Sequence, residues 1–287
     1  MARIAVARMA PAVGHFLVWL VIVLSAVSLT CVSRSRPPII VWRPKIWDLE
    51  RMPQLYLIRH GQSENNARAG ESLRTADPGL THTGQLQAVR VASHLAREAD
   101  RTDVRDGFVV ECGYRIGRLF CSPMLRALQT ALPIGEALSL SPEVWVDTHE
   151  GGGVWLDRED GRGRVGHGGL TRAEMETRFP EFDIPDAVTG DGWWNGTFEL
   201  REQLVARAAR VARDFRDLMP GATGRIAMVS HGTFLNLLVQ HLVFGTHVPG
   251  CRFSCHNTAI SRLDFEGDRL MVRYLNRVDH LDDDLVT

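Results

Sequence analysis

Short apolar runs alternate along the chain with segments in which apolar residues recur every three or four positions. The short runs predict β-strands, and the recurring apolar positions predict amphipathic helices. Strands are predicted at residues 55–58, 118–121, 144–146, 225–230, 258–265 and 270–275, and helices at 86–98, 170–179, 199–218 and 234–242. Because helices separate most of the strands, the pattern predicts a three-layer α/β fold with a mostly parallel central sheet and helices on both faces.

Residues 151–195 differ in character from the segments around them. They are rich in glycine and contain the pair Trp193-Trp194. Thr171 and Glu174 have the spacing of a capping box, which supports a short helix at 170–179. A long insertion of this kind inside a compact domain usually carries function. We therefore expect residues 52–287 to form one domain, with residues 151–195 as a cap over its site.

The N-terminal residues 1–51 contain a hydrophobic segment, residues 13–32, in which 16–32 is almost wholly apolar. This length is just sufficient to cross a bilayer. More positive residues follow the segment than precede it, which favours an anchor that keeps the following domain in the cytoplasm. A cleaved secretory signal and a misassigned translation start ahead of Met52 are two further interpretations. The sequence leaves all three open.

Chemistry-bearing residues follow three of the predicted strands directly. Arg59-His60-Gly61 ends the first strand, Arg126 comes shortly after the second, and His231 follows the 225–230 strand. Gly61 allows the backbone to turn tightly after the histidine. The carboxyl ends of strands in an open α/β sheet meet at one edge, where such folds bind ligands. A histidine or arginine at a single strand end is more often structural or on the surface, but together these residues are candidates for binding an anionic group at that edge.

Composition narrows the classes of function. Lys+Arg number 33 against 34 Asp+Glu, so bulk charge gives no case for nucleic-acid binding. Five cysteines without framework spacing argue against a disulfide scaffold and suit a reducing compartment. Cys251 and Cys255 lack a second ligand pair, so no metal site is predicted. The acidic stretch 279–284 is expected to be a solvated tail.

Together the motifs resemble those of the histidine phosphatase superfamily, the phosphoglycerate mutase-like proteins. The matching segments, in the family's order, are Leu57–Ser63 with Asn66, Leu80-Thr81 with Gly84 and Gln87-Ala88, Ser122–Ala131, and Val229–Gly232. They span roughly residues 53–265. The resemblance implies a phosphoglycerate mutase-like fold, a small phosphomonoester as substrate, and no metal or other cofactor.

The resemblance also implies roles for individual residues. His60 would attack phosphorus and carry the phosphoryl group covalently, and neighbouring arginines would keep its imidazole neutral. His231 would donate a hydrogen bond to the phosphoryl oxygens. The remaining expected phosphate-binding residues are Arg59, Arg126, Asn66, Gln62, Ser63 and Gly61.

A carboxyl group must protonate the leaving oxygen and later activate water. The resemblance places it after the third strand, which makes Glu150 the preferred candidate and Asp147 the alternative. The sequence departs from the commonest family pattern here, because Gly151–Gly153 replaces a mixed spacer.

The sequence is also compatible with two functions other than hydrolysis. A phosphoglycerate mutase would use the same covalent step, but mutases carry a Trp where this chain has Asn65. A catalytically silent module that binds phosphorylated ligands is the other alternative, although no core residue of the motifs is missing.

Overall fold

A computed structural model of the chain describes residues 52–68, 74–97, 113–158, 160–161, 163–194, 196, 198–222, 224–267 and 269–287, and the backbone of 103–105 and 108–110. They all belong to one compact unit, Pro44–Thr287. The predicted hydrophobic segment 13–32 lies outside the described residues. Of the helices that the structure describes, none combines the length and hydropathy needed to span a bilayer.

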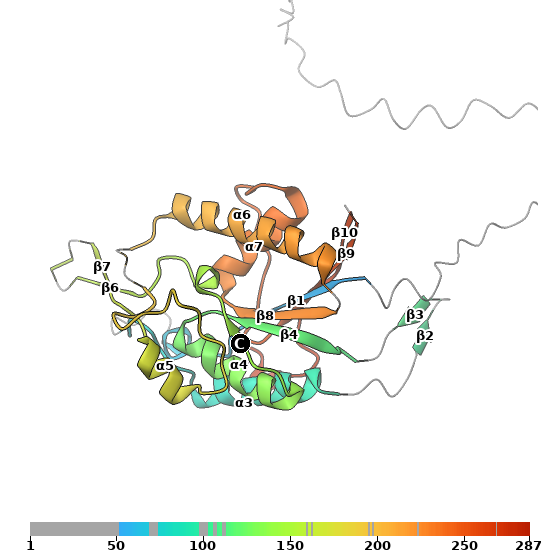
Figure 1. The fold of residues 1–287 in the computed structure, drawn as a ribbon, viewed down its shortest axis with the longest axis horizontal. Coiled ribbons are helices and arrows are strands. Elements are labelled where there is room, and N and C mark those ends of the chain that lie inside the picture. Colours follow the sequence, from blue (N-terminus) through green and yellow to red (C-terminus); the bar gives the residue numbers. More distant parts are fainter. Residues whose placement is uncertain are drawn as a thin grey trace, which may run out of the picture. The chain divides into compact units, whose positions relative to one another are not determined.

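The fold is built on a six-stranded mixed sheet, as the alternation of strands and helices predicts (Figure 1). The strand order is β10 (Arg269–Arg277), β9 (Ile260–Glu266), β1 (Gln54–Arg59), β8 (Arg225–Ser230), β4 (Ile116–Cys121) and β5 (Glu143–Val144). β1, β8, β4 and β5 run parallel, and β9 and β10 are antiparallel additions at one edge. The carboxyl ends of β1, β8 and β4 therefore lie side by side.

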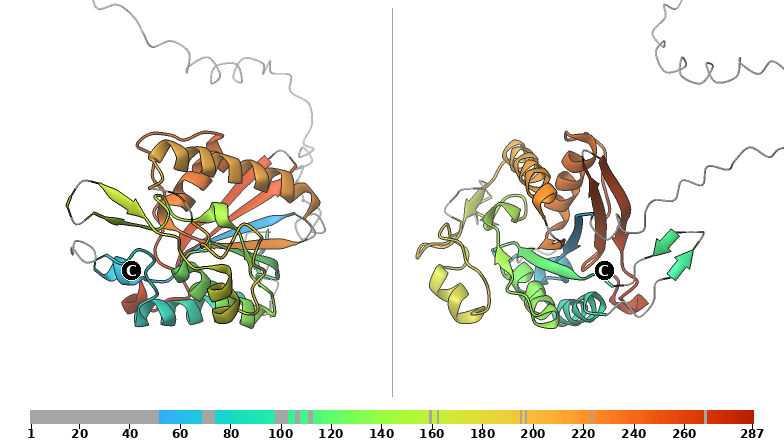
Figure 2. Two further views of the ribbon diagram at one scale, coloured as in Figure 1. Left: turned by 60° about the vertical axis from the view of Figure 1, so that its left-hand side comes forward. Right: turned by 45° about the vertical axis from the view of Figure 1, so that its right-hand side comes forward.

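Helices cover both faces of the sheet, as predicted (Figures 1 and 2). α3 (His82–Leu95) and α4 (Leu125–Leu138) pack on one face, and α6 (Arg201–Leu218) and α7 (Gly232–Phe244) pack on the other. α4 begins at Leu125 with Met124 as N-cap, so Pro123 precedes the helix. The short α2 (Glu64–Ala67) follows β1.

The alternation of side chains along β1 divides the interior into two cores, because successive residues of a strand point to opposite faces. Tyr56 and Ile58 belong to the core beneath α3 and α4. Leu55 and Leu57 belong to the core beneath α6 and α7. All four side chains are at most 1% exposed, so the strand is buried on both faces and its end is rigidly placed.

The cap differs in detail from the prediction. α5 (Arg172–Arg178) forms with the expected capping box of Thr171 and Glu174. A hairpin of β6 (Trp155–Asp157) and β7 (Arg164–Gly166) was not predicted, because glycine-rich residues around it hide the strand signal. Met175, Phe179 and Trp193 are buried in the same core as α3 and α4, so the cap is packed against the domain.

Two further predictions need correction. The third strand ends at Val144, and Val146 belongs to the 3₁₀ helix η1 (Val146–Thr148). A second hairpin, of β2 (Asp103–Arg105) and β3 (Phe108–Val110), was also not predicted.

The acidic C-terminal segment is not simply a solvated tail. It contains the 3₁₀ helix η3 (Asp283–Leu285), and the Leu285 side chain is buried. Nε2 of Gln87 donates to the carbonyl oxygen of Leu285 at 2.7 Å and to Oγ1 of Thr287 at 2.8 Å. The acidic residues face solvent, but hydrogen bonds to α3 hold the segment that carries them.

Candidate active site

The ends of adjacent parallel strands bring the two histidines of the site together. His60 follows β1 and His231 follows β8, and the register pairs Arg59 with Ser230. The two imidazole centroids are 5.0 Å apart, with an angle of 55° between the rings. Both side chains are at most 3% exposed.

The main chain sets the orientation and tautomer of His60. Its Nδ1 lies 2.6 Å from the carbonyl oxygen of Gly61. Because a carbonyl oxygen only accepts, the neutral ring carries its proton on Nδ1 and its lone pair on Nε2. Nε2 accepts a hydrogen bond from Nε of Arg126 at 3.2 Å. Burial, together with the charges of Arg126 and Arg59, holds the pKa of His60 well below its usual range, so the ring is neutral at pH 7.

The loop that carries His60 is held by neighbouring elements. Gly61 N–H donates to Oγ1 of Thr130 in α4 at 3.0 Å. Nδ2 of Asn257 donates to the carbonyl oxygen of His60 at 2.9 Å. On the side of α3, a Cβ atom at Gly61 would lie 2.5 Å from the carbonyl oxygen of Gly84. A glycine is therefore required for this close approach.

Two arginines flank His60. Arg126 lies in the first turn of α4 and is 8% exposed; its NH1 is 3.5 Å from the carboxylate of Asp77. Arg59 is the last residue of β1, and its NH1 donates to the carbonyl oxygen of Cys255 at 2.7 Å. Its buried Nε has no hydrogen-bond partner among the described residues. Planar guanidinium groups in these positions suit the oxygens of a phosphoryl group.

His231 is the N-cap residue of α7 and is completely buried. Its Nε2 lies 2.7 Å from Oγ of Ser122, which follows β4. Within the described part of the chain its Nδ1 has no partner. Burial, and then the charge of Arg126, lowers the pKa of His231 well below its usual range. A buried ring nitrogen without a partner is costly, and a phosphoryl oxygen beside His60 would satisfy it.

Glu150 lies at the helix end that carries His231. Its Oε1 accepts from the N–H of Phe234 at 3.0 Å, and its Oε2 accepts from the N–H of Thr233 at 3.1 Å. Oε1 also accepts from the N–H of Gly151 at 2.9 Å. A carboxylate in this position caps the first turn of the helix and complements its dipole.

Asp147, the alternative acid, has a different environment. Its Oδ2 is 3.0 Å from NH2 of Arg210 in α6, and both side chains are partly exposed. The carboxylate thus forms a surface ion pair on α6, whereas Glu150 is bound to α7 beside His231.

The three glycines after Glu150 are explained by packing. A Cβ atom at Gly151 would lie 2.6 Å from Cδ2 of Leu204, and one at Gly153 would lie 2.3 Å from Cε2 of Trp194. Gly152 and Gly153 also have φ values of +91° and +71°, which side chains rarely adopt. The unusual spacer therefore fits this close packing, most strictly at Gly152 and Gly153.

Three polar residues predicted to bind phosphate follow His60. The side chains of Gln62 and Ser63 form hydrogen bonds that hold the loop, whereas Asn66 also carries an amide donor. Ser63 is buried and caps α2 by accepting from the N–H of Asn66 at 3.4 Å. Oε1 of Gln62 accepts from Oγ1 of Thr81 at 2.8 Å. Oδ1 of Asn66 accepts from the N–H of Ser63 at 3.3 Å and from Nδ2 of Asn257 at 3.4 Å. The opposite side of the Asn66 amide therefore carries its Nδ2 donor.

Comparison with known proteins places this arrangement in a family. The sequence model of the histidine phosphatase superfamily (branch 1) matches residues 55–278. The chain belongs to the histidine phosphatase superfamily. No curated protein matches it.

The chain is also similar to solved structures of other proteins. A mycobacterial hydrolase matches with 19% identity, over 82% of this chain and 95% of its own, at a TM-score of 0.50. The phosphoserine phosphatase of Entamoeba histolytica matches with 20% identity, over 80% and 99%, at a TM-score of 0.49. A mycobacterial glucosyl-3-phosphoglycerate phosphatase matches with 19% identity, over 78% and 99%, at a TM-score of 0.48. At these identities the likeness concerns the fold alone.

Several residues of this histidine phosphatase site were missed by sequence reasoning. Thr130 and Asn257 hold the backbone of the His60 loop, and Asp77 lies beside Arg126. Their positions along the chain carry no signal of this. His149 is 2% exposed, and its ring centroid lies 4.8 Å from that of Trp194. Burial lowers the pKa of His149 to about 3. Its position next to Glu150 in the sequence was the one feature that could have indicated that it lies at the site.

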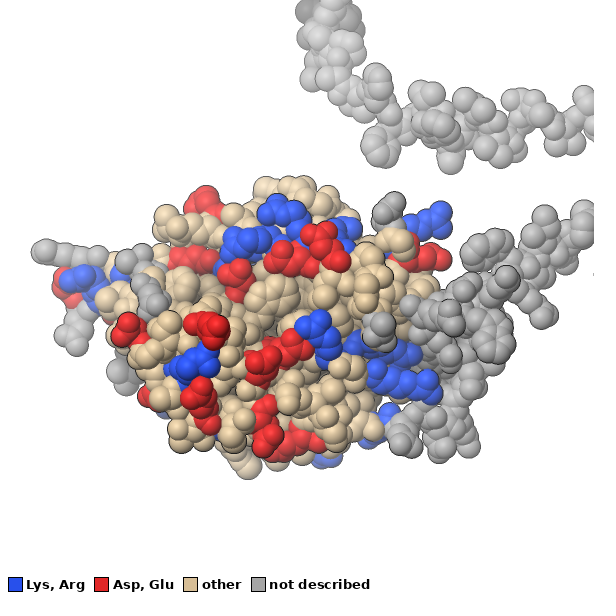
Figure 3. All heavy atoms as spheres, viewed as in Figure 1, with Lys and Arg blue, Asp and Glu red and all other residues tan. Residues whose placement is uncertain are grey.

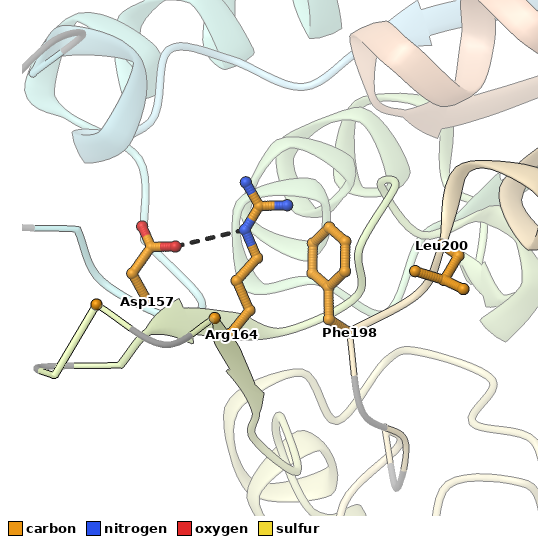
Figure 4. A pocket seen from close by; sticks show the side chains of 6 residues that line it. Asp157, Arg164, Phe198 and Leu200 are labelled. Atoms are coloured by element: carbon orange, nitrogen blue, oxygen red, sulfur yellow. Dashed lines mark hydrogen bonds and ion pairs between the residues drawn. The ribbon is translucent and has the colours of Figure 1, made fainter.

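A separate hollow of ≈ 560 Å³ lies between the β6–β7 hairpin and residues 198–200 (Figure 4). It is lined by Asp157, Gly161, Gly163, Arg164, Phe198 and Leu200. The guanidinium carbon of Arg164 is 4.3 Å from the ring centroid of Phe198, and its Nε is 3.4 Å from the Asp157 carboxylate. None of the residues at the strand ends lines this hollow.

Basic and acidic side chains are interspersed on the face of the molecule shown in Figure 3. This distribution agrees with the formal net charge of −1.

Proposed function

We propose that this protein is a phosphatase that hydrolyses a phosphomonoester through a phosphohistidine on His60, without a metal ion. The observation that carries the proposal is the tautomer of His60. Its Nδ1–H donates to the carbonyl oxygen of Gly61, so the Nε2 lone pair lies toward the guanidinium group of Arg126. A neutral imidazole beside fixed cations can attack an anionic phosphoryl group.

In the first step, Nε2 of His60 forms a bond to phosphorus as the bond between phosphorus and the ester oxygen breaks. The Nδ1–H stays on the ring, and the Gly61 carbonyl oxygen stabilises the positive charge that develops there. The phosphoryl oxygens take over hydrogen bonds from Arg126, Arg59 and His231, whose buried donors lie around the ring. Glu150, protonated, gives its proton to the departing alkoxide.

In the second step, Glu150 is a carboxylate and removes a proton from water. The water oxygen bonds to phosphorus, the bond between Nε2 and phosphorus breaks, and its electron pair returns to His60. Inorganic phosphate leaves, and Glu150 is protonated for the next cycle. The charge on the transferring group is balanced by the two guanidinium groups, which perform the electrostatic role that metal ions have in other phosphoryl-transfer enzymes.

The test is turnover and trapping with the purified wild type and His60→Ala. Wild type should release phosphate from 4-nitrophenyl phosphate and from members of a panel of sugar, glycerate and nucleoside monophosphates. It should also acquire an acid-labile, base-stable phosphoryl group on rapid quenching. His60→Ala should lose about 1,000-fold or more in kcat and all of the trapped phosphate.

Two outcomes would replace the proposal. Isomerisation of phosphoglycerate without phosphate release would assign a mutase. Binding of phosphate esters without turnover of any member of the panel would assign a silent binding module.

A further inference from the structure

An ion pair is buried between α6 and the segment that precedes it. Nε of Arg207 lies 2.7 Å from Oε1 of Glu199, and NH2 of Arg207 lies 2.7 Å from Oε2. The side chains are 5% and 7% exposed. The desolvation penalty of burying two charges is about as large as the Coulombic attraction between them, so such a pair adds little to the net stability of the fold. Its remaining hydrogen bonds indicate what it does.

Those bonds all go to the main chain on either side of Glu150. NH1 of Arg207 donates to the carbonyl oxygen of Asp147 at 2.7 Å and to that of His149 at 2.9 Å. Oε2 of Glu199 accepts from the N–H of Gly152 at 3.3 Å. The N–H of Glu199 donates to the carbonyl oxygen of Gly152 at 3.2 Å. Three main-chain groups of residues 147–152 are thus bound to the ion pair, and a fourth is bound to the main chain of Glu199.

The side chain of Glu150 is held by another helix. Its carboxylate binds the N–H groups of Thr233 and Phe234 in the first turn of α7. The guanidinium carbon of Arg207 lies 4.9 Å from the ring centroid of Phe234, and α6 and α7 lie side by side on one face of the sheet (Figure 1). α6 therefore fixes the backbone of the Glu150 segment, and α7 fixes its carboxylate.

We propose that the Glu199–Arg207 pair positions Glu150 for proton transfer to the leaving oxygen. This inference rests on the proposed function, in which Glu150 is the general acid. The pair does not touch the reacting atoms and acts through the carbonyl groups of Asp147 and His149. Without it, the carbonyl groups of Asp147 and His149 lose their hydrogen bonds to Arg207. The backbone on either side of Glu150 is then less well fixed, and so is the distance from its carboxyl group to the ester oxygen.

The consequence depends on the leaving group. A poor leaving group needs the proton as the bond to phosphorus breaks, whereas 2,4-dinitrophenolate leaves without it. The test compares kcat/KM for phenyl phosphate and 2,4-dinitrophenyl phosphate. We expect Arg207→Met combined with Glu199→Gln, which removes both charges together, to lose about 100-fold with phenyl phosphate and less than about fivefold with the dinitrophenyl ester.

Arg210→Met is the matched control. Arg210 lies one turn further along α6 and pairs with the side chain of Asp147, not with the main chain. Its removal should change both rates by less than about twofold. If the double variant does not fold, Glu199→Gln alone is used, and its smaller loss must still be concentrated on phenyl phosphate.

Glu150→Gln separates failure of this inference from failure of the proposed function. If Glu150→Gln is selective against phenyl phosphate but the pair variants lose both esters equally, or lose nothing, the pair is merely structural and the inference is overturned. If Glu150→Gln itself shows no such selectivity, Glu150 is not the acid and the mechanism fails. Addition of the pair variant to Glu150→Gln should cost little more for phenyl phosphate, because both changes remove the same proton transfer.

Discussion

Gly61 lies so close to the first turn of α3 that a methyl group cannot be added there without moving the main chain. The Cβ of Gly61→Ala would stand 2.5 Å from the carbonyl oxygen of Gly84. This is about 1 Å less than an ordinary non-bonded separation. The loop cannot simply retreat, because the N–H of Gln62 donates to Oε1 of Gln87 in α3 at 2.7 Å and the N–H of Gly61 donates to Thr130 in α4.

The expected loss in activity follows from the position of His60. Gly61 supplies both the next backbone atoms and the carbonyl oxygen that binds Nδ1 of His60. A shift of about 1 Å in a reacting group costs about 100-fold in rate, so kcat/KM of Gly61→Ala for 4-nitrophenyl phosphate should fall about 100-fold. Overpacking should also cost about 1–3 kcal/mol of unfolding free energy, which lowers Tm by roughly 2–12 °C.

The same contact can be tested from its other side. A Cβ at Gly84 would lie 2.1 Å from the carbonyl oxygen of Gln62. Alanine favours a helix interior over glycine by about 1 kcal/mol, yet Gly84→Ala should lose activity as Gly61→Ala does. Gly221→Ala is the control, because no atom lies within 4 Å of a Cβ built there. Activity and Tm within error of wild type in both site variants would refute the argument.

Three further predictions concern protons and metals. Burial lowers the pKa of His60, His231 and His149 below the pKa of a histidine in the unfolded chain. Below about pH 6.5 the unfolded state therefore binds more protons than the folded state. The free energy of unfolding should fall as the pH is lowered below this value. For His149, whose pKa is lowered to about 3, this costs about 2 kcal/mol at pH 5. Urea unfolding should therefore show His149→Gln losing about 2 kcal/mol less than wild type between about pH 7.5 and pH 5, and equal losses would contradict this. Glu150→Gln should lower kcat/KM for phenyl phosphate by about 10²–10⁴-fold, while Asp147→Asn should change it less than threefold or so because its carboxylate is in a surface ion pair; the reverse order would assign the acid to Asp147. Phosphate release should be the same before and after dialysis against EDTA, and restoration by a divalent cation would show that a metal takes part.

Much of the fold follows from local patterns. The four apolar residues of β1 and the hydrophobic face of α6 appear in the sequence as runs and repeats, so their element types were predicted correctly. The hairpin β6–β7 was missed, because its three-residue strands are too short to show alternation among glycines. The third strand was placed too far along the chain, because Val146 is apolar but belongs to η1.

The acidic C-terminal segment illustrates another limit. Its aspartates were interpreted as a solvated tail, since a run of like charges usually stays in water. Leu285 and Thr287, which follow that run, bind Gln87 from a helix nearly 200 positions earlier in the chain. A pattern along the chain cannot reveal such a partner.

The sequence by itself determined which residues end the central strands, because apolar runs and the polar residues after them are local features. From these came the α/β fold and the candidates His60, His231, Arg59 and Arg126. Only the tertiary structure decided how these groups are arranged. The contact of His60 with Arg126, the binding of Glu150 to α7 rather than α6, and the hydrogen bonds of Arg207 to residues 147 and 149 join distant segments. Such bonds form only when the whole sheet brings those segments together, so no stretch of the chain contains them.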